Sequence, residues 1–84
     1  MLNRAGPALH HARRCLEICV ANGIGDFDLA FAYEALARAH AVAGGTDQSR
    51  KYVRLGEEAA GQIRDEGNYR YVLGELDDVS VMLA

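Results

Sequence analysis

The chain has 84 residues, 50% of them hydrophobic, and its 12 acidic and 9 basic residues give a net charge of −3. A chain of this length forms one domain that buries only about 60–65% of its unfolded surface, so its core is small unless a staple or a partner adds to it. The acidic balance argues against a nucleic-acid-binding protein, which usually has a basic face, and the longest apolar run is too short to span a membrane.

The N-terminal segment and the two cysteines indicate a cytoplasmic protein. Residues 1–7 lack the apolar stretch of a signal peptide. Cys15 and Cys19 lie four residues apart on a predicted helix, where two thiols are poorly placed to bond to each other. A reducing compartment would keep both as thiols.

The first predicted helix covers residues 8–21. It follows Pro7, which suits the N1 position of a helix, and it ends before Gly23, which suits a left-handed C-terminal cap. Its apolar residues recur at spacings of three and four, as expected for one helix face. This stripe comprises Leu9, Ala12, Leu16 and Cys19.

The second predicted helix covers residues 26–43, begins at an N-cap at Asp26 and is apolar on nearly all sides. A helix that is apolar around most of its circumference packs between other elements instead of lying on a surface. Gly44 and Gly45 end this helix.

Two further helices are predicted at residues 46–65 and 68–82, capped by Thr46 or Asp47 and by Asn68 respectively. Both have apolar positions with helical spacing. The apolar face of the third helix comprises Val53, Leu55, Ala59, Ala60 and Ile63, and that of the fourth comprises Tyr69, Val72, Leu73, Leu76, Val79 and Leu83.

Residues 12–19 and 49–56 form an internal repeat, 37 residues apart. Both segments run small, basic, basic, bulky, aliphatic, charged, aliphatic, small. A period in the thirties built from two helices is typical of α-solenoids. We therefore expect the two segments to stack and share a buried layer, with small residues at Ala37, Ser49 and Gly56 that let the helix axes approach closely.

These motifs resemble the tetratricopeptide repeat over about residues 8–63. The chain is also similar to the C-terminal part of uncharacterised bacterial helical-repeat proteins. The first-helix positions of the motif correspond to Tyr33, Leu36, Ala37 and His40. The second-helix pair of the motif corresponds to Ser49 and Val53, and the same pair in a preceding half repeat corresponds to Ala12 and Leu16. The turn glycine corresponds to Gly44.

The resemblance implies an all-α fold of antiparallel helix hairpins, a tetratricopeptide-like α-solenoid fragment in which residues 1–84 form one domain. That domain would contain a half repeat at 8–21, a full repeat at 26–65 and a terminal helix at 68–82. Its implied function is a non-enzymatic protein-interaction module that binds partners on its concave face. The predicted protein-binding residues are Phe31, Glu34, Arg38, Ala41 and Val42.

Two of these predictions have alternatives. Glu34 and Arg38, at positions i and i+4, could simply pair with each other. His40 is predicted to pack in the core or an interface, with a ligand-binding or pH-sensing role as the alternative.

Self-association is also predicted, because a repeat unit cannot bury its faces alone. The first helix lacks the antiparallel mate of a full repeat, so its stripe of Leu9, Ala12, Leu16 and Cys19 should seek another surface. We expect a homodimer or docking on a longer partner. The alternative is a monomer whose fourth helix folds back over the gap.

Two chemical alternatives involve the first helix. His11, Cys15 and Cys19, four residues apart, could hold zinc in a metal-stabilised dimer if His40 supplied the fourth ligand. Buried cysteine also behaves as a small hydrophobe, and packing is the favoured interpretation. A Cys15–His11 nucleophile would have no oxyanion hole, so no catalytic residue and no cofactor is predicted.

A basic edge provides the remaining alternative, a regulator that binds RNA or a small anionic ligand. Charges of this kind more often form a solvated face. The edge comprises Arg13, Arg14, Arg50, Lys51 and Arg54.

Overall fold

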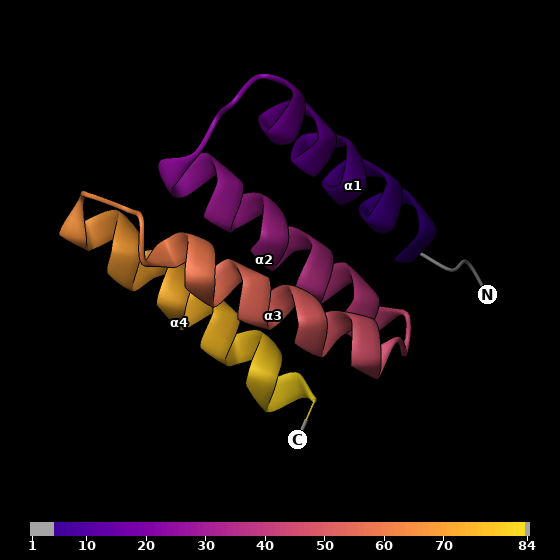
Figure 1. The fold of residues 1–84 in the computed structure, drawn as a ribbon. Coiled ribbons are helices and arrows are strands. Elements are labelled where there is room, and N and C mark those ends of the chain that lie inside the picture. The colour runs from indigo at the N-terminus through magenta and orange to yellow at the C-terminus, as the bar shows by residue number, and fades with distance from the viewer. Residues whose placement is uncertain (1–4, 84) are drawn as a thin grey trace.

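The computed structural model describes residues 5–83, which form four α-helices and no β-strand. Consecutive helices run antiparallel (Figure 1). The all-α prediction is therefore confirmed for this part of the chain. None of the four helices is long and apolar enough to cross a membrane. The helices are α1 (Ala5–Ala21), α2 (Asp26–Val42), α3 (Thr46–Ala60) and α4 (Glu66–Met82).

Helix α2 is the centre of the fold, because it contacts the other three helices. Helices α3 and α4 also contact each other, whereas α1 contacts only α2. Alanines on several sides of α2, including Ala30, Ala32, Ala37 and Ala39, are almost fully buried. The prediction that this helix packs between other elements is confirmed.

The predicted stacking of the two repeated segments on each other is wrong. Helices α1 and α3, which carry these segments, do not contact each other, and each packs on α2. Equivalent small positions are nevertheless buried in both helices: Ala12 and Cys19 in α1, Ser49 and Gly56 in α3. The repeated pattern thus describes how a helix packs on α2, because sequence periodicity specifies a face and not the identity of its neighbour.

Two clusters of buried side chains form the core on the α3 and α4 side of α2. One lies between the first half of α2, the end of α3 and the first half of α4, and the other lies at the opposite end of these helices. The first comprises Ala30, Ala60, Ile63, Val72 and Leu76, and the second comprises Ala37, Val53 and Val79.

The predicted close approach at small residues is confirmed. The Ser49 hydroxyl donates a buried hydrogen bond of 2.7 Å to the carbonyl oxygen of Ala37, which joins α3 to α2. A Cβ atom on Gly56 would lie 2.9 Å from Leu76 Cδ2 and 3.4 Å from Tyr33 Cβ. Gly56 is therefore needed where α3 touches both α2 and α4.

Replacing Gly56 with valine is expected to lower the free energy of unfolding by about 1–3 kcal/mol, as overpacking typically does. Gly74→Val is the matched control, because Gly74 is exposed on α4 and its added Cβ would meet nothing within 4 Å. Urea titrations monitored by circular dichroism measure both effects. Equal stability of the two variants would contradict the close approach.

The boundary between the third and fourth helices differs from the prediction. Helix α3 ends at Ala60 instead of residue 65, and α4 begins at Glu66. Asp65 is the N-cap of α4, and its Oδ1 accepts a hydrogen bond of 2.8 Å from the Asn68 amide, so Asn68 is not the cap. The third helix was predicted too long because Ile63 continues the helical spacing of apolar residues. Ile63 instead lies in the loop between α3 and α4, and its side chain is buried in the core.

The other helix ends agree with prediction in part. Gly23 and Gly44 have φ angles of 63° and 85°, as expected at left-handed positions after a helix. Asp26 is not an N-cap: it is the first residue of α2, with φ 56°, and Gly25 precedes it as the cap. Neither Thr46 nor Asp47 caps α3, whose N-cap is Gly45.

Candidate protein-binding groove

A groove of about 440 Å³ lies between α1 and α2, with α4 at one end. A second hollow of about 340 Å³ continues it along the same two helices. The two share His11, Phe31 and Ala35, so we treat them as one α1–α2 groove. Its other lining residues are Ala8, Ala12, Cys15, Ile18, Cys19 and Ile24 on the α1 side, and Asp28, Ala32, Glu34, Arg38, Ala39, Val42 and Glu75 on the α2 and α4 side.

Four of the five predicted protein-binding residues line this groove: Phe31, Glu34, Arg38 and Val42. Ala41 does not, because it packs against the core cluster of Ala37, Val53 and Val79. Adjacent residues of an α-helix point about 100° apart, since a turn holds about 3.6 residues. Ala41 was therefore placed on the wrong side of α2.

Phe31 forms the aromatic part of the groove. Its ring stacks on Phe27 at a centroid distance of 5.5 Å and on Tyr71 of α4 at 6.3 Å. Phe31 is still 39% exposed. The neighbouring rings therefore hold it in place while one part of its surface stays available to a ligand.

A charged network lies where α4 borders the groove. Arg38 Nε donates to Glu34 Oε2 at 2.8 Å, and Arg38 Nη2 donates to Glu75 Oε2 at 2.9 Å. The hydrogen bond with Glu34 is the main reason that the pKa of Arg38 lies above its usual value. The alternative prediction, that Glu34 and Arg38 pair with each other, is confirmed. Arg38 also ties α2 to α4 through its ion pair with Glu75.

The predicted self-association stripe is largely covered within the chain. Ala12 and Cys19 are buried, and Leu9 and Leu16 are half-buried, on a helix whose only neighbour is α2. Burial raises the pKa of the Cys19 thiol, and the Asp28 carboxylate adds to this effect. Helix α2 is thus the antiparallel mate that α1 was expected to lack.

Cys15 and His11 lie side by side on α1, with 3.7 Å between Cys15 Sγ and His11 Nε2, and both line the groove. Within residues 5–83, no group of three or more His, Cys, Asp or Glu side chains is placed to hold a metal ion. His40, which the zinc alternative required as its fourth ligand, stacks instead on Tyr52 of α3.

His40 packs against α3, as predicted. Its ring stacks on Tyr52 with centroids 5.5 Å apart and an interplanar angle of 11°. Burial, with a smaller contribution from the positive charge of Arg13, lowers the pKa of His40. The neutral imidazole is therefore the form that this interface favours.

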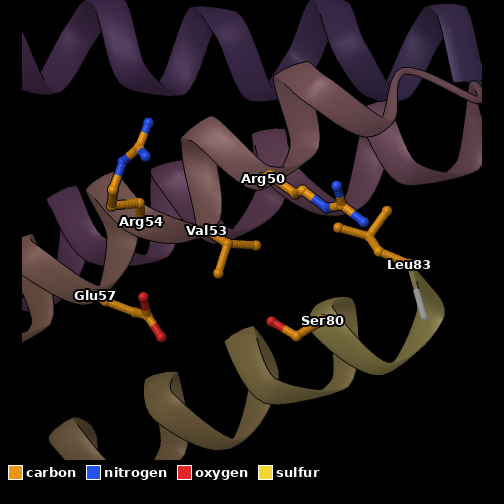
Figure 2. Close-up of a pocket in the computed structure, with 6 residues that line it drawn as sticks. All are labelled: Arg50, Val53, Arg54, Glu57, Ser80 and Leu83. Carbon is orange, nitrogen blue, oxygen red and sulfur yellow. The ribbon is translucent and has the colours of Figure 1, made fainter.

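The predicted basic edge is divided in the structure. Arg13 and Arg14 are on α1, which does not contact α3. Arg50 and Arg54 line a pocket of about 260 Å³ between α3 and α4, together with Val53, Glu57, Ser80 and Leu83. In Figure 2 the Arg50 side chain extends toward Leu83, whereas Arg54 points away from Ser80. The two guanidinium groups thus diverge and do not form one anion site.

Several groove residues were missed from the sequence. Ala35 could have been found, because it is four residues after Phe31 and shares its helix face. Glu75 gave no local signal, since its partner Arg38 is 37 residues away in the chain.

Comparisons of this chain with protein-family models, with curated proteins and with solved structures find no match.

Proposed function

We propose that this chain is a non-enzymatic, cytoplasmic protein-interaction module that holds an amphipathic helix of another protein in the α1–α2 groove. The observation that carries the proposal is the groove itself, which presents a partly exposed aromatic ring and small apolar residues between two helices. Apolar grooves of this kind bind the apolar face of a helix, and buried aromatic residues contribute much of the affinity at interfaces.

The length of the groove supports a helical ligand. Its lining runs along α2 from Asp28 to Val42, and a helical segment of that length spans about 21 Å at 1.5 Å per residue. A partner helix of four turns would match it. Small residues such as Ala32, Ala35 and Ala39 would let the two backbones approach closely.

We also propose that the four helices follow a tetratricopeptide-like arrangement. The support is the repeated pattern in α1 and α3, in which small residues at equivalent positions pack on α2. The absence of contact between α1 and α3 is a departure from a regular solenoid, in which equivalent helices of successive repeats are neighbours.

The groove is tested with 20-residue helical peptides selected from a displayed random library against the protein. Val42→Asn is expected to weaken the selected peptides about tenfold, because losing one buried aliphatic contact costs about 1.5 kcal/mol. Val20→Asn is the matched control, since Val20 is 67% exposed and Val42 61% exposed, but only Val42 lines the groove. Equal binding by both variants, with folding verified by circular dichroism, would reject the proposal.

A homodimer is the second part of the proposal, and the attachment of α1 through α2 alone favours it. Exchange of α1 between two copies would let Leu9, Ala12, Leu16 and Cys19 make the same contacts with the partner's α2. Light scattering over a dilution series is expected to show a mass that rises above 9.1 kDa with concentration. A constant mass of 9.1 kDa would exclude self-association.

A further inference from the structure

Carboxylates lie at two sites along the α1–α2 groove. Asp28 lines one end, near Cys19, and Glu34 and Glu75 line the part that borders α4. Asp78 is exposed and lies three residues after Glu75 on α4, so the two share a face of that helix. Its charge also contributes to the raised pKa of Arg38. Acidic groups are therefore available at two separate sites along a mainly apolar groove.

Within residues 5–83, the one guanidinium in the groove lining does not offset these charges. Arg38 is shared between Glu34 and Glu75, so two carboxylates and one cation leave an excess negative charge at that site, and Asp78 adds to it. Asp28 forms no ion pair among the described residues. The described part of the α1 wall, from Ala5 on, adds no Asp, Glu, Lys or Arg to the lining.

The distance between the two acidic sites follows from the helix geometry. Asp28 and Arg38, the partner of Glu75, are ten residues apart on α2, which corresponds to about 15 Å along the axis. Phe31, Ala32 and Ala35 lie between them in the groove. A helix laid along α2 would therefore meet an acidic site at Asp28, an apolar stretch, and a second acidic site beside Arg38, one turn before Val42.

We propose that the partner helix carries a Lys or Arg at each end of its apolar stripe, about ten residues apart, so that one cation faces Asp28 and the other faces Glu75 and Asp78. This inference rests on the proposed function and specifies the chemistry of the partner. It applies to either direction of the bound helix, because both of the sites that the cations would face are acidic.

Two synthetic 16-residue peptides test the charge pattern. Both have the same Ala/Leu face, but one has Arg ten residues apart at its ends and the other has Glu at the same positions. Fluorescence anisotropy at low salt is expected to show at least tenfold tighter binding of the Arg peptide, and high salt should reduce this preference because it screens exposed charges.

Charge reversal in the protein provides the matched variants. Asp28→Lys/Asp78→Lys is expected to shift the preference toward the Glu peptide, since both aspartates are exposed. Glu57→Lys/Glu58→Lys makes the same change in net charge on α3, outside the groove, and should leave the preference for the Arg peptide unchanged. Thermal melts verify that both double variants are folded.

The possible failures are distinguishable. If the two peptides bind equally and Val42→Asn weakens both, the charge inference is overturned and the groove function stands. The charge inference is also overturned if the two double variants shift the preference alike. If neither peptide binds and the library yields no ligand that depends on Val42, the groove function fails as well.

Discussion

Leu76→Ala is expected to lower the free energy of unfolding by about 2–5 kcal/mol, the usual cost of removing a buried leucine side chain. Leu76 is 1% exposed and lies in the core cluster with Ala60 and Val72. It also fills the space beside Gly56, where α3, α2 and α4 meet. Small domains have only about 5–15 kcal/mol of stability in total, so this single change should unfold a large fraction of the protein on mild heating.

Val81→Ala is the control for this prediction, because Val81 is on the same helix but is 67% exposed. Its effect should stay within about 0.5 kcal/mol, as for most surface substitutions. Urea titration monitored by circular dichroism gives both values. A loss of less than 1 kcal/mol for Leu76→Ala would mean that α4 is not packed as described.

Arg38→Leu is expected to cost about 1–3 kcal/mol, because the buried Glu34 carboxylate would lose its hydrogen-bonding cation. The Glu34 side chain is only 5% exposed, and that of Arg38 is 38% exposed, so solvent reaches one side of the pair and keeps the effect below that of a fully buried ion pair. The change also removes the link from α2 to Glu75, which holds α4 beside the groove.

A double-mutant cycle separates the interaction energy of the Glu34–Arg38 pair from the cost of leaving the Glu34 carboxylate buried without a partner. Glu34→Leu/Arg38→Leu should recover much of the stability lost in Arg38→Leu. The control is the Glu66–Arg70 pair on α4, which has the same i,i+4 spacing and the same 2.8 Å separation but side chains 75% and 76% exposed. Arg70→Leu should cost about 0.5 kcal/mol or less. Similar losses of unfolding free energy in Arg38→Leu and Arg70→Leu would contradict the prediction that burial of Glu34 makes its ion pair the stronger one.

Local sequence predicted the helices and their C-terminal glycines accurately, whereas the N-caps of α2, α3 and α4 were each placed one to three residues too late. The spacing of apolar residues identified four helices, and Gly23 and Gly44 marked the ends of two of them. The apolar circumference of residues 26–43 predicted a central helix. These features are encoded within a few turns of chain, because helical period and left-handed glycine positions need no distant partner.

Predictions that required a choice of neighbour were less accurate. The stripe of α1 was identified, but its contact is α2 of the same chain, and the repeated segments lie on separate helices that do not touch. Ala41 was assigned to the groove and packs in the core. Ile63 was assigned to a helix, but it lies in the loop between α3 and α4 and its side chain is buried in the core. Each pattern is compatible with more than one packing.

By itself, the sequence determined the number of helices, their approximate limits and the side chains that avoid water. The tertiary structure alone decided that α1 and α2 form one groove bordered by Glu75 of α4, and that Glu75 joins Glu34 in binding Arg38. The physical reason is that hydrophobic burial is non-directional, so it specifies that a face is covered without specifying by what. Shape complementarity and long-range ion pairs, which exist only in the folded chain, make that choice.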